Sequence, residues 1–387
     1  MEIQQTPLPA TWKAVIGFLL SGYLFALLGA ILPSWELRQP FGFDIVGAYF
    51  LSLSLGVIAA TQVAPRVERR GTGFMLVFAC LLACGALLFL SMVPPPAPAI
   101  WRMSGLLVVG LATGTLNSAL FHTISRNYES DPAGTVNTGG IFYGFGCLAA
   151  ALLVSATFYV PSILTFVAIV PGCFAGVYAN TQIAMPAQEG QPTLGQALRD
   201  LRSTGAMLFA LLLFFQFGNE YSIAGWLPLF LIHHLGTSPK TAILMLAFYW
   251  MALLVGRTVA VSALPRLPHA KLLGGSVLSA MFGCLILAFT NNLFGAGTAI
   301  LLIGAGFASI YPLVAEKIGR RFPYYNPGLF NGIFSFALMG GMVAPATLGV
   351  AAQHWGVGAV VWLPALGTSM VFVLLLLIWL ESKVTGR

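Results

Sequence analysis

The chain has 387 residues, of which 58% are apolar and only 7% carry a charged side chain. Soluble domains carry about a quarter charged residues, so this composition excludes a soluble globular protein and requires a bilayer to cover most of the surface. In such a chain the net charge of +7 does not indicate nucleic-acid binding, and the distribution of the charges matters more.

Twelve apolar segments follow one another, each close to the roughly 20 residues that a helix needs to cross the hydrocarbon. Short connections rich in turn-forming residues separate them, such as Pro94-Pro95-Pro96 and Asn291-Asn292. The first segment lacks the cleavage site of a signal peptide, so we expect it to be retained. The predicted spans are about 12–35, 43–64, 73–93, 101–126, 135–159, 162–183, 205–232, 241–263, 270–290, 293–314, 328–353 and 357–380.

Lysine and arginine gather on one set of the connections between these spans. Fifteen basic residues fall on one side, whereas only Arg38, Arg102 and Lys240 fall on the other. Because cytoplasmic loops are enriched in Lys and Arg, we expect both termini in the cytoplasm and the chain in the cytoplasmic membrane, with the lipid bilayer around it.

One pattern of proline, arginine, asparagine and glycine occurs twice in the chain. A duplicated membrane chain usually places its binding site near the midplane, at the repeat interface, so the pattern predicts a transporter. We expect two six-helix halves, 1–183 and 205–387, joined by a cytoplasmic linker over 184–204. The recurring pairs are Pro33 and Pro228, Arg126 and Arg321, Pro132 and Pro327, Asn137 and Asn331, Gly56 and Gly256, Pro65 and Pro265, and Arg66 and Arg266.

Four short motifs carry a resemblance to a known family. They are Phe217-Gly-Asn-Glu-Tyr-Ser-Ile-Ala-Gly-Trp-Leu, Phe248-Tyr-Trp followed by Gly256-Arg257, Asn331-Gly-Ile-Phe-Ser followed by Gly340-Gly341 and Pro345, and the looser Asn137 with Phe142-Tyr-Gly-Phe-Gly. The whole chain resembles the major facilitator superfamily, and these motifs resemble its fucose-permease-like sugar transporters. The resemblance implies an all-α membrane protein of two pseudo-symmetric six-helix bundles, a sugar as substrate and transport by alternating access.

The chain departs from the fucose-type proton symporters at two places. Those symporters carry acids in their first and fourth helices, whereas residues 22–29 and 110–117 of this chain contain none. Coupling to H⁺, coupling to Na⁺ and passive uniport therefore all remain open.

Glu220 is the candidate for proton coupling or substrate binding. It lies about 15 residues, or roughly 22 Å at helical rise, from the inner end of the seventh span. A carboxylate at that depth is costly unless it faces water or a partner, so an acid there is a functional candidate; the alternative is a structural acid paired with a neighbouring span. Gly218, Gly225 and Pro228 flank it, and we expect them to interrupt the helix.

Amide and aromatic side chains at a similar depth are candidates for substrate binding. Amides offer the donors and acceptors that sugar hydroxyls need, and aromatic rings offer a platform for the apolar face of a sugar. The alternatives are polar contacts between helices and ordinary packing or interfacial aromatics. The candidates are Asn117, Asn137, Gln216, Asn219 and Asn331 among the amides, and Tyr143, Trp226, Tyr249, Trp250 and Tyr311 among the aromatics.

Charged residues at the inner helix ends are candidates for a cytoplasmic gate, in which salt bridges between spans hold one alternating-access state. These residues are Arg66, Glu68, Arg126, Arg266, Glu316 and Arg321.

Other kinds of function find little support in the sequence. The chain has no phosphate-binding Lys loop, no catalytic constellation and no metal-ligand cluster, so we expect neither an enzyme nor a cofactor. We predict a monomeric secondary transporter that moves a small polar solute. The alternative is an exporter of amphipathic compounds, for which the Phe- and Met-rich walls would supply an adaptable surface.

Overall fold

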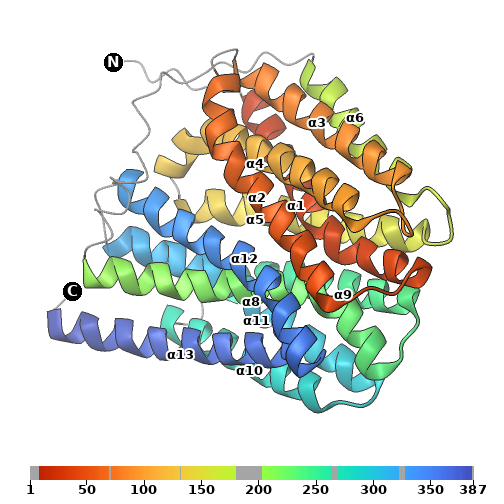
Figure 1. Cartoon of the computed structure of the whole chain (residues 1–387). Helices are drawn as coiled ribbons and strands as arrows, with labels where there is room; N and C mark the ends of the chain where they lie inside the picture. Colours follow the sequence, from red (N-terminus) through yellow and green to blue (C-terminus); the bar gives the residue numbers. More distant parts are fainter. Residues whose placement is uncertain are drawn as a thin grey trace. The chain divides into compact units, whose positions relative to one another are not determined.

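The computed structural model describes residues 8–68, 71–130, 132–179, 203–263, 268–321 and 327–385. Within these ranges the chain forms twelve helices and no strand (Figure 1). The bilayer core offers no water to backbone N–H and C=O groups, and a helix satisfies them all within one segment. The prediction of an all-α membrane protein with twelve helices is confirmed.

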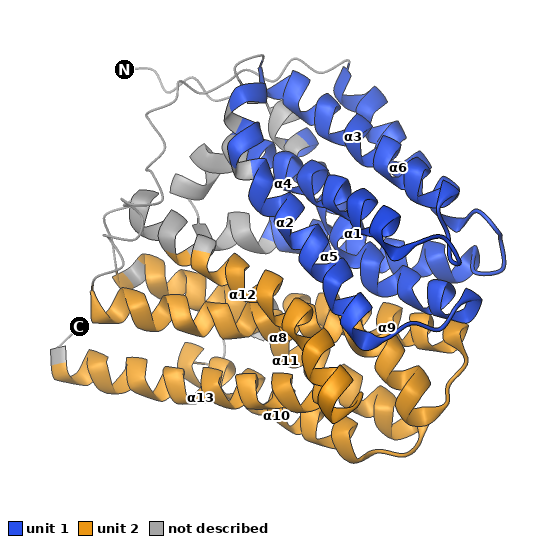
Figure 2. Cartoon of the chain, viewed as in Figure 1, with its two compact units in different colours: residues 1–188 blue, residues 189–387 orange. Residues whose placement is uncertain are grey.

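The helices divide into two compact units, residues 1–188 and residues 189–387 (Figure 2). The expected linker, 184–204, lies almost entirely outside the described residues, so its limits stay a prediction. Unit 1 contains α1 (Leu8–Arg38), α2 (Phe43–Glu68), α3 (Thr72–Met92), α4 (Ala99–Ser130), α5 (Pro132–Ala156) and α6 (Ile163–Ala179). Unit 2 contains α8 (Thr204–Leu235), α9 (Pro239–Ala263), α10 (His269–Phe289), α11 (Leu293–Arg321), α12 (Pro327–Trp355) and α13 (Ala359–Thr385).

Eleven of the described helices are long and apolar enough to cross a membrane. The other, α6, is apolar and has 17 described residues. Large apolar side chains such as Leu81 on α3 and Phe282 on α10 are more than half exposed, as expected of surfaces that lipid covers.

The two units repeat one pattern of helix packing. In unit 1, α1 packs on α5, α2 on α4, and α3 on both α4 and α6. In unit 2, α8 packs on α12, α9 on α11, and α10 on both α11 and α13. Most helix pairs of unit 1 therefore recur in unit 2, as the repeated sequence pattern predicts, but α13 packs mainly on α8 whereas its counterpart α6 packs mainly on α3.

Glycine allows the paired helices to touch through their backbones. A Cβ atom on Gly146 of α5 would lie 1.8 Å from the carbonyl oxygen of Leu19 on α1. A Cβ atom on Gly340 of α12 would lie 2.0 Å from the carbonyl oxygen of Phe214 on α8. The two glycines occupy corresponding places in the repeat, so the same close approach of helices recurs in both units.

Candidate functional site

The helix that carries Glu220 begins at a well-formed cap. The side chain of Ser203 accepts a hydrogen bond from the backbone N–H of Ala206 at 3.3 Å, which satisfies one of the free donors of the first turn. The helix then continues unbroken to Leu235, through Gly218, Gly225 and Pro228. The expected interruption near Glu220 is therefore wrong: α8 remains helical because α9, α11, α12 and α13 all pack against it.

Glu220 is buried near the middle of α8 and lies among polar groups of unit 2. Its side chain is 7% exposed, and the guanidinium of Arg257 on α9 is close enough to act on its charge. The phenol of Tyr311 on α11 lies within range of both charges. Three helices thus place an acid, a guanidinium cation and a phenol within electrostatic range of one another, and opposite charges stabilise each other at this depth.

Gln216 lies one turn before Glu220 on the same face of α8. Its side chain is fully buried and lies next to the Glu220 carboxyl, although the two groups do not reach the geometry of a full hydrogen bond. Neither polar atom of this amide forms a hydrogen bond with any residue that the structure describes. Gln216 therefore adds a buried amide to the face of α8 that carries Glu220.

A further buried donor belongs to Trp250 on α9. Its indole Nε1–H has no hydrogen-bond partner in the described part of the chain, and the residue is 1% exposed. Tyr249 is also buried, and its ring packs edge to face on that of Trp250 with centroids 5.1 Å apart. Trp250 and Arg257 are seven residues apart and therefore share a face of α9.

Asn219 points away from this cluster. Its Nδ2 donates a hydrogen bond to the Thr368 hydroxyl on α13 at 3.3 Å, and both residues are buried. A Cβ atom on neighbouring Gly367 would lie 2.1 Å from the Asn219 Oδ1, so the glycine makes room for the amide. In this arrangement Asn219 connects α8 to α13, and its role in substrate binding stays a prediction.

Trp226 likewise makes a contact within unit 2. Its indole Nε1–H donates to the carbonyl oxygen of Pro345 on α12 at 2.9 Å, in fully buried surroundings. The ring of Tyr311 packs edge to face on Phe217 with centroids 5.1 Å apart. Trp226 is thus fixed against α12, whereas Tyr311 stays beside the Glu220 cluster.

In unit 1, the described candidates lie on α4 and α5. The side-chain oxygen of Asn117 accepts a hydrogen bond from the Ser21 hydroxyl on α1 at 2.6 Å. The ring of Tyr143 lies 6.2 Å from that of Phe25, between centroids. The side chains of Asn137 and Asn331 lie outside the described residues.

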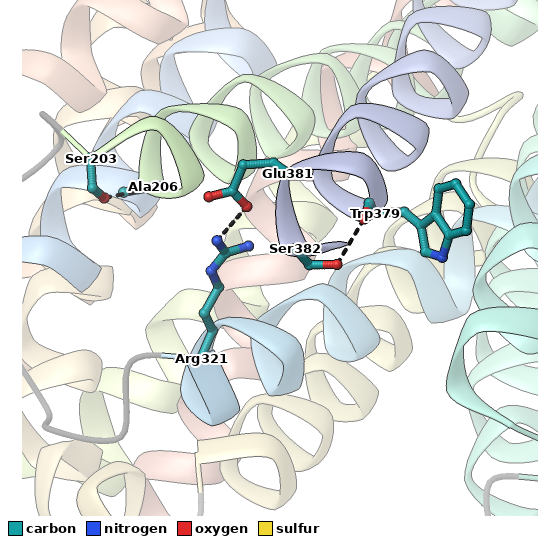
Figure 3. Close-up of polar contacts among 6 residues, drawn as sticks. All are labelled: Ser203, Ala206, Arg321, Trp379, Glu381 and Ser382. Carbon is teal, nitrogen blue, oxygen red and sulfur yellow. Dashed lines mark hydrogen bonds and ion pairs between the residues drawn. The ribbon is translucent and has the colours of Figure 1, made fainter. Parts of the chain in front are cut away.

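The gate candidates that the structure describes find partners within their own unit. Arg321 at the end of α11 forms an ion pair with Glu381 on α13 (Figure 3). Glu316 pairs with His269, the first residue of α10, at 3.0 Å. Arg66 donates to the carbonyl oxygen of Gln62 on its own helix. The side chains of Glu68 and Arg126 and the whole of Arg266 lie outside the described residues.

Sequence reasoning missed several of these partners. Arg257 is not among the predicted site residues, although the Gly256-Arg257 motif places it on a candidate helix. No comparable signal in the sequence points to Thr368 or Glu381, because their contacts depend on which face of α13 meets α8 and α11. Arg102 was expected on an outer connection, but it is 3% exposed and donates to the Tyr49 hydroxyl at 2.7 Å.

Residues 4–154 and 137–339 match the profile of the Major Facilitator Superfamily. The chain belongs to the Major Facilitator Superfamily. It is similar to an uncharacterised MFS-type transporter of Yersinia pestis, with 24% identity over 347 residues, 87% of this chain and 88% of the relative. The expected family is therefore confirmed, and the chain is a multi-pass membrane transporter and not an enzyme.

Solved structures of other transporters share this fold. The fucose:proton symporter FucP of E. coli superposes with a TM-score of 0.66 and 16% identity, over 97% of this chain and 99% of that one. The nucleoside transporter NupG gives a TM-score of 0.70 with 14% identity, over 97% and 100%. The human organic anion transporter MFSD10 gives 0.68 with 13% identity, over 96% and 100%. At these identities the likeness establishes the fold alone.

Proposed function

We propose that this transporter moves a small polar solute by alternating access, and that the solute is a sugar or a sugar derivative. Glu220 would bind the solute, take up a proton, or do both. The observation that carries the proposal is the buried cluster of Glu220 with Gln216, Arg257 and Tyr311, contributed by three helices of one unit. Intramembrane acids are rare and mark substrate or proton pathways. Sugar and nucleoside transporters among the similar folds support a polar solute.

The test is uptake into proteoliposomes by the full chain. Glu220→Gln removes the titratable group while keeping the size of the side chain, so we expect folding to persist and concentrative uptake to be lost. Asp44→Asn is the matched control, because Asp44 is an exposed acid in the first turn of α2. Unchanged accumulation by the Glu220 variant would refute the proposed role of this residue.

A ligand screen chooses between the polar solute and the alternative, an exporter of amphipathic compounds. A ligand that binds only the folded protein raises its melting temperature by mass action. We expect stabilisation by at least one sugar or sugar derivative from a panel and none by amphipathic drugs. Stabilisation by the drugs alone would favour the exporter.

We also infer that the chain lies in the cytoplasmic membrane with both termini in the cytoplasm. The support is the distribution of basic residues, fifteen on one side of the predicted spans and three on the other. Reporter domains fused to each terminus should both report a cytoplasmic location. A periplasmic signal from either fusion would show that the topology is wrong.

A further inference from the structure

Few charged side chains are buried in the described part of this transporter, and they are divided unequally between the two units. Among the described residues the buried charged side chains are Arg102 in unit 1, and Glu220 and Arg257 in unit 2. In the whole sequence, Glu220 is the acid that falls in the interior of an apolar span, and the other acids lie at span ends or in connections. The cluster around Glu220 therefore contains one carboxyl and one guanidinium.

The protonation of Glu220 decides the charge of this cluster. With the carboxyl ionised, Glu220 and Arg257 sum to zero; with the carboxyl protonated, they sum to +1, because an arginine keeps its proton in proteins. A net charge held within the membrane is costly unless a counter-charge accompanies it. A proton that enters this site is therefore best accompanied by an anion.

Arginine also determines which anion fits. Its planar guanidinium presents paired N–H donors that match the two oxygens of a carboxylate. Gln216, one turn from Glu220, and Trp250, on the Arg257 face of α9, add buried hydrogen-bonding atoms that no described residue satisfies. An amide and an indole N–H suit hydroxyl groups, which both donate and accept.

We propose that the solute is a small hydroxylated monoanion of the sugar-acid class, which enters together with one proton. Its carboxylate pairs with Arg257 while the proton resides on Glu220, and its hydroxyls bond to Gln216 and Trp250. The inference rests on the proposed transport of a polar solute and narrows its chemical class.

Apart from Glu220 and Arg257, the titratable groups on the packed helices are either neighbours of this cluster or groups nearer the helix ends. On α8 itself they are Tyr221, the residue directly after Glu220, and His233 and His234 near the end of the helix. On α9 they are Lys240 in the first turn and the buried Tyr249, and on α12 the titratable group of the described part is His354 in the last turn. The remaining groups are Tyr311, Glu316, Lys317, Arg320 and Arg321 on α11, and Glu381 and Lys383 on α13.

The first test compares matched solutes on the full chain in proteoliposomes. Gluconate, galactonate, glucuronate and galacturonate are measured beside glucose, galactose and sorbitol. We expect at least one acid, and none of the neutral compounds, to be accumulated when the outside is acidic. Accumulation of a neutral sugar without any acid would overturn this inference and leave the proposed function standing. Accumulation of neither class would also overturn the inference. If, in addition, only the amphipathic drugs of the ligand screen stabilised the protein, the proposed transport of a polar solute would be wrong as well.

The second test uses an imposed membrane potential. A proton and a monoanion together carry no net charge, so a potassium diffusion potential of about 100 mV should change accumulation of the acid less than two-fold. Transfer of one net charge would change it roughly 50-fold. A voltage dependence of that size would contradict entry of one proton with one monoanion.

A third test uses variants to distinguish the role of the Glu220 carboxyl from that of the Arg257 guanidinium. Binding of the transported acid is measured by thermal shift at acidic and at neutral pH. Glu220→Gln mimics the protonated state, so binding should persist and lose its pH dependence. Arg257→Gln should weaken binding at least ten-fold, but it leaves a buried acid that endangers folding. The double variant with both substitutions contains no buried charge in the cluster and is expected to fold without binding the acid. Retained binding by a folded double variant would overturn the proposal.

Discussion

Asn219 on α8 donates its side-chain amide to the hydroxyl of Thr368 on α13, at 3.3 Å in a buried setting. The next residue, Glu220, lies instead in the cluster with Arg257 and Tyr311. One helix therefore uses successive residues for two purposes, attachment to α13 and presentation of an acid. Substitutions at the two positions should have different effects on stability and on transport.

Thr368→Val should destabilise the protein without abolishing transport. The substitution removes the acceptor and leaves the Asn219 amide buried without it, which costs about 1–3 kcal/mol. Thermal unfolding of the purified variant measures the loss, and uptake in proteoliposomes measures function. Thr298→Val is the control, because Thr298 is exposed and bonds to its own helix. Equal stability of the two variants would show that the bond to Asn219 contributes nothing.

Gly340→Ala should separate α12 from α8. The added methyl group would lie 2.0 Å from the carbonyl oxygen of Phe214, and backbone cannot yield as a flexible side chain does. We expect a loss of about 1–3 kcal/mol or more, visible as a lower melting temperature. Gly274→Ala on α10 is the matched control, since an added Cβ there meets no atom within 4 Å. A control variant as unstable as Gly340→Ala would argue against close helix contact as the cause.

Trp226→Phe should lower stability while leaving the bulk of the ring in place. It removes the indole donor that bonds the Pro345 carbonyl oxygen at 2.9 Å, a contact between α8 and α12. We expect a loss of about 0.5–1.5 kcal/mol. Trp379→Phe is a suitable comparison because Trp379 is half exposed. If Trp226→Phe unfolded at the same temperature as the parent protein, this hydrogen bond would not hold the two helices together.

The ion pair between Arg321 and Glu381 joins the ends of α11 and α13 (Figure 3). Both side chains are mostly buried, at 12% and 18% exposure, so salt should screen the pair less than a surface pair. A double-mutant cycle with Arg321→Gln and Glu381→Gln should give a coupling energy of about 1 kcal/mol that survives high salt. Additive effects of the two substitutions would mean that the pair contributes no net stability.

Much of the fold could be predicted because a membrane imposes simple rules on sequence. Apolar length gave the twelve helices, and the recurrence of glycine and proline indicated two equivalent halves. Glu220 could be singled out since an acid inside an apolar span is costly by position alone. These signals depend on the local sequence and need no knowledge of how a helix is rotated about its axis.

The partners of the candidate residues could not be predicted in the same way. Glu316 meets His269 at the start of α10, and Asn219 meets Thr368 on α13. Each outcome depends on the rotation of a helix by a fraction of a turn, which the uniformly apolar faces of these helices do not reveal. Whether the remaining candidates bind a solute stays a prediction.

Direct backbone contact at Gly146 and Gly340 also limits how the transporter can move. Where the carbonyl of one helix lies against the glycine of the next, no layer of side chains is left to slide or repack. We therefore expect the pair α1 with α5, and likewise the pair α8 with α12, to move as a rigid unit through the transport cycle. Spectroscopic labels on the two members of one pair would keep a constant separation and provide an internal ruler for motions elsewhere.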